Sequence, residues 1–253
     1  MAAAFPFLDH DGPIAFAHRG GSAEAPENSW AAFEHAVSLG YSYLETDVRA
    51  TADGVAVALH DPTLDRVASR PGELSKMAWA EVQAAKLADG REPPLLEELL
   101  AAWPDVRWNI DVKTQEAVAP VVDVLRRTAS VDRVLVAAFS DRRSALVRAE
   151  LGPTLAIGAG RRTVATLVAA KVVGLVPVRT RAIAAQVPLK QGGVPIVDAS
   201  FLRVCHRANV AVHVWTIDDE NEMDRLLDLG VDGIMTDRPT TLKQVLERRG
   251  QWP

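Results

Sequence analysis

Short apolar runs alternate with longer helical patterns along most of the chain. Runs rich in Val, Ile, Leu and Ala are typical of buried strands, and longer periodic stretches are typical of helices packed on one side. The predicted strands cover residues 14–18, 43–49, 55–59, 108–113, 134–139, 155–158, 182–187, 209–217 and 233–236. The predicted helices cover residues 29–39, 79–85, 95–102, 117–129, 142–151, 163–171, 220–229 and 241–248.

This alternation predicts parallel strands with helices on their faces. About eight such units in a chain of 253 residues fit a single α/β domain over 1–253, a closed (β/α)8 TIM barrel. A doubly wound open sheet is the alternative. Neither of the glycine-rich phosphate-binding motifs, G-x-G-x-x-G and G-x-x-x-x-G-K-[ST], occurs in the sequence.

Two segments depart from the regular rhythm. Residues 61–94 contain several prolines and only a short helical stretch, which predicts an insertion above the barrel with a lid as one candidate role. Residues 172–198 show little regular pattern apart from one strand. Within the regular part, Asn28 is the expected N-cap of the first helix, and Asp53-Gly54 predicts a tight turn between two strands.

The composition is that of a soluble enzyme, and the net charge of -5 argues against a broad basic surface for nucleic acid. The single cysteine, Cys205, cannot form an internal disulfide, which is compatible with a reducing compartment. Residues 1–13 lack the features of a secretory signal, and no apolar run approaches the roughly 18 residues that span a bilayer. We expect a cytoplasmic protein without a membrane span, of undetermined oligomeric state.

Two carboxylates lie two residues apart on the second predicted strand. Glu45 and Asp47 therefore point to the same face, about 7 Å apart. Inside a barrel, burying both without compensation costs several kcal/mol, and a bound cation is the simplest remedy. The alternative is a structural ion pair with Arg19, Arg49 or Lys113.

The same spacing recurs at Asp111 and Lys113 on the strand 108–113. Asp111 is a candidate third oxygen ligand, and Lys113 would project beside it toward a phosphoryl oxygen. A set of carboxylates favours Mg²⁺ or Ca²⁺, with Mn²⁺ as a further candidate, over Zn²⁺. A plain Asp–Lys ion pair at the mouth of the barrel is the alternative.

Two histidines, His18 and His60, each end an apolar strand and flank the carboxylate pair. Imidazoles titrate near neutral pH, so one can accept a proton while the other donates one. Zinc ligation by both histidines is the competing interpretation. Arg19 suits a bidentate grip on a phosphate, although strand alternation can bring it in from a different side. A structural ion pair is its alternative role.

Four further residues are candidates for contact with a ligand. Glu27 is a candidate contact to the metal or its waters, and Asn28 can bond a ligand as well as cap the helix. Trp215, at the end of the strand 209–217, would line a pocket for an alcohol or glycerol group, with core packing as the alternative. Phe139 is a candidate substrate contact near the same pocket.

The ordered series of motifs resembles the glycerophosphodiester phosphodiesterases over nearly the whole chain. The matching segments are Ala17-His18-Arg19-Gly20-Gly21, Pro26-Glu27-Asn28-Ser29, Leu44-Glu45-Thr46-Asp47-Val48, Asp53-Gly54 with His60-Asp61, Pro94-Leu95-Leu96-Glu97-Glu98, Asn109-Ile110-Asp111-Val112-Lys113, Val214-Trp215-Thr216-Ile217-Asp218 and the run 230–239. Any one motif alone would be weak, but their order makes the series specific.

The resemblance implies a TIM barrel with a small insertion after the second strand region. The roles that it implies are divalent metal ligation by Glu45, Asp47 and Asp111, acid–base catalysis by His18 and His60, and phosphate binding by Arg19 and Lys113. The expected products are sn-glycerol 3-phosphate and a free alcohol. Position 111 is usually Glu in this family, so the shorter Asp111 is expected to shift the metal or admit a water. Ser29 and Ala138 also replace the commoner Thr and Ser.

The predicted activity is therefore metal-dependent hydrolysis of a small glycerophosphodiester. The first alternative is a phosphodiesterase of the lysophospholipase D type, for which residues 61–94 or 172–198 would have to supply an apolar collar. The second alternative is a non-catalytic barrel that binds a phosphate ligand.

Overall fold

The computed structural model describes residues 5–173 and 178–252, and its centre is a ring of parallel strands. The strands of this ring are β1 (Ile14–Ala17), β2 (Tyr43–Ala50), β4 (Arg107–Val112), β5 (Val134–Ala137), β6 (Ala156–Ile157), β7 (Ala184–Val187), β10 (Ala211–Val214) and β11 (Gly233–Thr236). They are hydrogen-bonded in the order β6-β5-β4-β2-β1-β11-β10-β7. A parallel bridge between Gly158 and Ala184 joins the two outer strands, so the sheet closes on itself. The predicted TIM barrel is confirmed, and the open doubly wound sheet is not formed.

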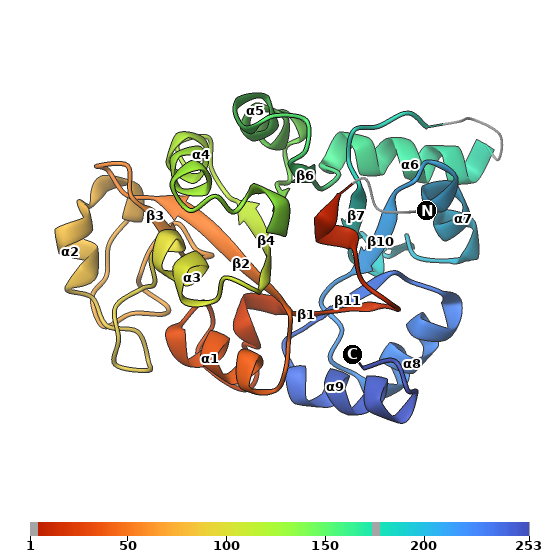
Figure 1. The fold of residues 1–253 in the computed structure, drawn as a ribbon, viewed down its shortest axis with the longest axis horizontal. Coiled ribbons are helices and arrows are strands. Elements are labelled where there is room, and N and C mark those ends of the chain that lie inside the picture. The colour runs from red at the N-terminus through yellow and green to blue at the C-terminus, as the bar shows by residue number, and fades with distance from the viewer. Residues whose placement is uncertain (1–4, 174–177, 253) are drawn as a thin grey trace.

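Helices cover the outside of this ring (Figure 1). They are α1 (Trp30–Ser38), α3 (Leu96–Ala102), α4 (Val118–Arg127), α5 (Asp141–Leu151), α6 (Arg161–Val173), α7 (Ala199–Arg207), α8 (Glu220–Leu229) and α9 (Pro239–Arg248). Their apolar faces and the outward faces of the strands form the largest buried cluster of the protein. None of the helices in the described residues is long and apolar enough to cross a membrane.

The first helix begins one residue later than the sequence suggested. The hydroxyl of Ser29 accepts the backbone N–H of Ala32 at 3.2 Å, so Ser29 is the N-cap. Asn28 has a φ of 50° and directs its side chain elsewhere, so its prediction as the cap was wrong. Its amide is instead bonded inside the barrel mouth, where a buried carboxylate offers a stronger partner than a helix end.

Residues 188–208 contain elements that the sequence analysis missed. A short hairpin pairs β8 (Lys190–Gln191) with β9 (Val194–Pro195), and α7 follows it. The Asp198 carboxylate caps α7 by accepting the backbone N–H groups of Ser200 and Phe201. The buried residues of α7, Phe201, Leu202 and Cys205, have a helical spacing, so this helix was legible in the sequence.

Residues 55–94 project from the side of the barrel. Strand β3 (Ala56–Ala58) pairs antiparallel with β2, and α2 (Trp79–Gln83) lies beside it at the left edge of Figure 1. This segment has a small apolar cluster of its own. The buried members of that cluster are Val57, Leu59, Leu64, Leu74, Met77, Val82 and Ala85.

The interior of the barrel is filled with aromatic side chains at one end and is polar at the other. Phe7 and Phe16 both pack edge-on against Tyr43, with ring centroids 5.3 and 5.4 Å from that of Tyr43. Side chains two apart on a strand share a face, so Glu45 and Asp47 follow Tyr43 inward along β2. The aromatic layer therefore lies directly beneath the polar mouth of the barrel.

Candidate active site

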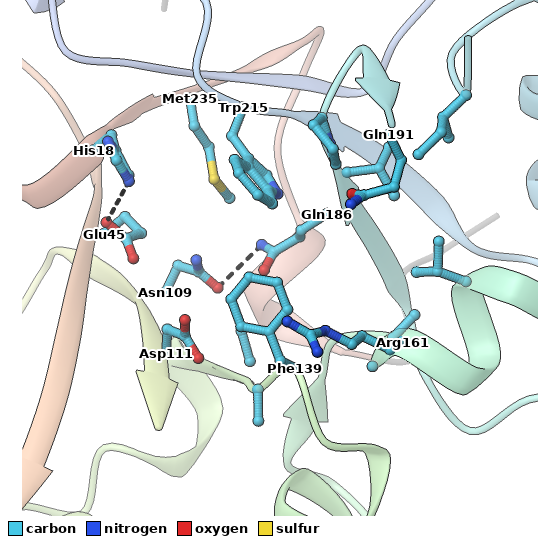
Figure 2. Close-up of a pocket in the computed structure, with 18 of the residues that line it drawn as sticks. His18, Glu45, Asn109, Asp111, Phe139, Arg161, Gln186, Gln191, Trp215 and Met235 are labelled. Atoms are coloured by element: carbon cyan, nitrogen blue, oxygen red, sulfur yellow. Dashed lines mark hydrogen bonds and ion pairs between the residues drawn. The ribbon is translucent and has the colours of Figure 1, made fainter. Parts of the chain in front are cut away.

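A cavity of about 830 Å³ opens at the carboxyl ends of the barrel strands. This is the end of a TIM barrel at which active sites are built. Of the residues singled out from the sequence, the cavity is lined by His18, Arg19, Glu45, Asp47, His60, Asp111, Lys113, Phe139 and Trp215. Figure 2 shows that His18 and Glu45 lie on one side of it, while Phe139 and Arg161 lie on the other. Glu27 and Asn28 are not among its lining residues.

The two β2 carboxylates are almost completely buried. Glu45 is 4% exposed and Asp47 is 1% exposed. In the register of β2 with β4, Glu45 lies beside Asn109 and Asp47 lies beside Asp111. The period of two along β2 thus places both carboxylates in the cavity, as the sequence predicted. The neighbouring parallel strand β4 places Asp111 beside Asp47.

Asp47 is surrounded by groups that neutralise its charge. Lys113 Nζ lies 2.6 Å from one carboxylate oxygen, and Arg19 Nε lies 3.0 Å from the other. The Asn28 side-chain amide also donates to Asp47, at 3.1 Å. Burial alone would raise the pKa of Asp47, but Lys113 and Arg19 outweigh burial and lower it. The structural ion pair weighed for Asp47 is therefore present, whereas Arg49 donates to the backbone oxygen of His60 instead.

Glu45 is compensated less well than its neighbour. It accepts the backbone N–H of Arg19 at 2.9 Å, and His18 Nε2 lies 3.8 Å from it. Burial, and then the negative charge of Asp47, raise the pKa of Glu45 to about 7. Positive charge thus compensates Glu45 less than it compensates Asp47, which makes Glu45 the natural place for a proton or a cation.

His18 is oriented by an aspartate from the far end of the chain. It follows β1 in a tight turn in which Arg19 adopts a φ of 53°, and this turn brings both side chains into the cavity. His18 Nδ1 lies 2.7 Å from Asp237 Oδ1. Burial would lower the pKa of His18, but Glu45 and Asp237 outweigh it and raise that pKa. Asp237 follows β11 and lies in the motif at 230–239, but the sequence analysis gave it no role.

His60, which also lines the cavity, is held in the same manner. Its Nδ1 lies 2.7 Å from Oδ1 of the adjacent Asp61. Arg66 donates to the other oxygen of Asp61 at 2.6 Å and lowers the pKa of that carboxyl to about 2. In both histidines a carboxylate engages Nδ1, which directs Nε2 away from that bond and leaves it for proton transfer.

Asp111 and Lys113 form the ion pair that was the alternative to their predicted roles. Lys113 Nζ lies 2.6 Å from Asp111 Oδ2 and bridges this carboxylate to Asp47. Burial would lower the pKa of Lys113, but these two carboxylates outweigh it and raise the pKa. The other oxygen of Asp111 is buried and accepts no hydrogen bond from the described residues.

Glu27 and Asn28 act from behind the cavity wall. Glu27 binds the guanidinium groups of Arg19 and Arg66. Asn28 is buried, and its side-chain oxygen accepts the hydroxyl of Thr46 at 2.7 Å. Both therefore contact groups that line the cavity, and direct contact with a ligand stays a prediction for each.

A divalent cation fits the chemistry of this site in two respects. Asp111 Oδ1 accepts no hydrogen bond from any residue that the structure describes, and Glu45 is compensated less well than Asp47. All of the candidate donors are carboxylate oxygens, which hard cations prefer. Within the described part of the chain, however, no three acidic, histidine or cysteine side chains converge closely enough to hold an ion. Binding would therefore require the carboxylates to approach one another and Lys113 to yield its place between two of them.

The outer half of the cavity is aromatic and apolar. Phe139 is 46% exposed and packs edge-on against Trp215, with ring centroids 6.2 Å apart. The Arg161 guanidinium lies over the Phe139 ring at 4.8 Å. Gln186 donates to Asn109 at 3.0 Å between the two halves (Figure 2). The apolar wall itself consists of Val164, Ala165, Val168, Val187, Pro188, Val194 and Ile196.

The chain is similar to known proteins over almost its whole length. A sequence model of the Glycerophosphoryl diester phosphodiesterase family matches residues 18–241. A Mycobacterium tuberculosis protein named Probable glycerophosphodiester phosphodiesterase 2 is 42% identical over 256 residues, which cover 97% of this chain and 95% of that protein.

Solved structures show the same fold. A crystal structure from Silicibacter pomeroyi superposes with a TM-score of 0.81 at 22% identity, covering 98% of this chain and 100% of the other. An Oleispira antarctica phosphodiesterase, solved in complex with the product sn-glycerol-3-phosphate, superposes with a TM-score of 0.76 at 22% identity, covering 93% and 97%.

The raised pKa of Glu45 predicts how stability depends on pH. Between its usual value of 4.5 and about 7, the folded protein holds a proton that the unfolded chain has lost, so stability falls as pH rises through this window. Glu45→Gln cannot ionise and can still accept the N–H of Arg19. In metal-free buffer at pH 8 we expect it to be more stable than wild type by on the order of 1–3 kcal/mol.

The difference in the free energy of unfolding between Glu45→Gln and wild type should shrink below pH 5. Urea unfolding at pH 8 and below pH 5 measures it. Glu116→Gln, at an exposed carboxylate, is the matched control and should change little at either pH. Equal stability of Glu45→Gln and wild type at pH 8 would contradict the assignment.

Proposed function

Because the chain belongs to the glycerophosphoryl diester phosphodiesterase family, we propose that it hydrolyses glycerophosphodiesters to sn-glycerol 3-phosphate and an alcohol, with His18 and His60 as its acid–base pair. As a member it is a phosphoric diester hydrolase, which sets the non-catalytic alternative aside. The observation that carries the proposal is the pairing of two carboxylate-bound histidines in one cavity with Arg19 and Lys113.

The roles of the two histidines follow from their surroundings. His18 has a raised pKa, because Glu45 and Asp237 outweigh its burial, and this suits it to donate a proton. His60 takes the proton of the nucleophile, which is water or the glycerol 2-hydroxyl of the substrate, as its oxygen attacks phosphorus. Attack by the 2-hydroxyl would give a cyclic phosphodiester, which a water molecule must then open to give glycerol 3-phosphate. The bond from phosphorus to the leaving oxygen breaks, and that oxygen receives the proton of His18.

The phosphate is held by cations that already line the cavity. Arg19 presents a planar guanidinium, and Lys113 presents a single ammonium between two carboxylates. Such preorganised positive charge stabilises the negative charge that develops on the phosphoryl oxygens. Asn28 and Glu27 keep Asp47 and Arg19 in place from behind.

Glu45, Asp47 and Asp111 are proposed to hold a divalent metal, Mg²⁺ or Ca²⁺ with Mn²⁺ as a further candidate. Two observations support this donor set: no described residue donates to Asp111 Oδ1, and the charge of Glu45 is only partly compensated. A cation bound there would neutralise phosphate charge as a Lewis acid.

The location of the protein in the cytoplasm also stays a prediction.

A second candidate substrate is a lysophospholipid, and the outer wall of the cavity favours it. Three apolar residues of α6 and several from 187–196 line a space of about 830 Å³. That volume lies in the upper part of the range for ligand pockets and exceeds the needs of a small polar diester. Residues 188–196 therefore supply the apolar collar that this alternative requires, whereas residues 61–94 line none of the cavity.

Loss of either histidine should remove most of the activity. We expect His18→Ala and His60→Ala each to lower kcat by ~10²–10⁴-fold, because each removes a proton-transfer group. Release of glycerol 3-phosphate from glycerophosphocholine measures the effect. His206→Ala, at a surface histidine on α7, should keep wild-type turnover. Near-full activity of both site variants with native circular dichroism would refute the acid–base pair.

Removal of metal should abolish activity and lower thermal stability. After treatment with EDTA, we expect added Mg²⁺, Ca²⁺ or Mn²⁺ to restore turnover and to raise the melting temperature, since the ion binds only the folded state. Asp111→Asn should weaken both responses, and Asp123→Asn, on the exposed face of α4, should preserve them. Full activity in EDTA, with no response to any of the ions, would contradict the metal site.

The apolar wall should matter for lipid substrates alone. We expect Val168→Asp to lower kcat/KM for lysophosphatidylcholine by about 10-fold or more, because a charge replaces a surface that would contact the acyl chain. Turnover of glycerophosphocholine should change little. A wild-type enzyme that cleaves glycerophosphocholine but not the lysolipid would rule out this second candidate.

A further inference from the structure

Arg66 binds two carboxylates close to the site without lining the cavity. Its Nε donates to Asp61 Oδ2 at 2.6 Å. Its two terminal nitrogens donate to the two oxygens of Glu27 at 2.7 and 2.8 Å. Each of the three guanidinium nitrogens therefore donates one hydrogen bond, which fixes orientation in a way that a single ammonium cannot.

Each carboxylate in turn holds a residue with a proposed role in the reaction. Asp61 Oδ1 lies 2.7 Å from His60 Nδ1. Glu27 Oε1 accepts from Arg19 Nη1 at 3.2 Å. A continuous chain of charged contacts thus runs from His60 through Asp61, Arg66 and Glu27 to Arg19.

The contacts of Arg66 are better suited to orientation than to stability. The Arg66 side chain is 51% exposed, and ion pairs at such exposure contribute little to the free energy of folding. The two carboxylates are less exposed than Arg66 and are themselves tied to the cavity wall. Arg66 therefore links Glu27, 39 residues before it in the sequence, to Asp61, 5 residues before it.

The backbone that carries Arg66 is anchored in the core of the side segment. Leu64 is fully buried among the apolar residues of that cluster. The backbone N–H groups of Val67 and Ala68 both donate to the oxygen of Leu64, which closes a tight turn around Arg66. The position of the guanidinium is thus set by a packed element.

We propose that Arg66 is a positioning residue that aligns His60, through Asp61, with Arg19, through Glu27, on one substrate. The inference rests on the proposed function. In it, residues 61–94 hold this arginine in position and do not act as a lid. Asp61 keeps the proton of His60 on Nδ1, so that Nε2 is left to accept the proton of the nucleophile. Glu27 likewise holds Nη1 of the Arg19 guanidinium, and Asp47 lies beside its Nε, so Nη2 is the nitrogen that is left for phosphate.

The kinetic test compares Arg66→Ala and Arg66→Lys with wild type on the glycerophosphodiester that wild type cleaves fastest. We expect kcat to fall ~10–100-fold in both, because a small displacement of catalytic groups has costs of this size and lysine lacks the two-edged fork. Arg66→Ala combined with Glu27→Gln should fall little further than Arg66→Ala alone. Arg70→Ala, in the same segment and paired with Glu81, is the matched control and should stay within twofold of wild type.

A second readout does not depend on turnover. Nitrogen-detected NMR of the His60 ring should show a single Nδ1–H tautomer in wild type and a mixture in Arg66→Ala. The proposal is overturned if Arg66→Ala keeps both the kcat and the His60 tautomer of wild type, or if Arg70→Ala loses as much activity. If wild type cleaves no glycerophosphodiester, the proposed function fails, and the NMR comparison still decides the role of Arg66.

Discussion

The burial of Glu45 and Asp47 side by side inside the barrel mouth is the constraint on which the site depends. Two negative charges in such a place are unfavourable unless cations or donors surround them. Lys113, Arg19 and Asn28 all turn toward Asp47, and Glu45 is left with His18 and one backbone N–H. The unequal compensation is why the pKa values of the two carboxyl groups move in opposite directions.

The barrel makes this burial tolerable by separating its interior into two layers. Aromatic rings around Tyr43 fill the lower layer, so water cannot approach the carboxylates from below. The upper layer collects polar side chains from consecutive strand ends and from the turns that follow them. The tight turn after β1 is a clear case, because the left-handed backbone of Arg19 lets two successive residues reach one cavity.

Much of this arrangement could be predicted from the sequence, because it follows from local periodicity. Strands β2 and β11 and helix α8 appear at or near their expected bounds, and the period of two along β2 places its carboxylates inward. The error at Asn28 arose because a tertiary partner outweighed a local preference. Asn28 has the chemistry of a helix cap, but the buried Asp47 engages its amide and leaves the cap to Ser29.

By itself the sequence determined the family, the closed barrel and most of the ionisable side chains that line its mouth, since motif order and strand alternation are properties of the chain. It did not predict the apolar wall of the cavity. Only the tertiary structure decided how the ionisable side chains pair. Asp237 orients His18 across 219 positions of sequence, and Arg66 reaches back 39 positions to Glu27. Such partners are chosen by distance in space after the barrel closes, because the energy of an ion pair depends on separation and burial rather than on order along the chain.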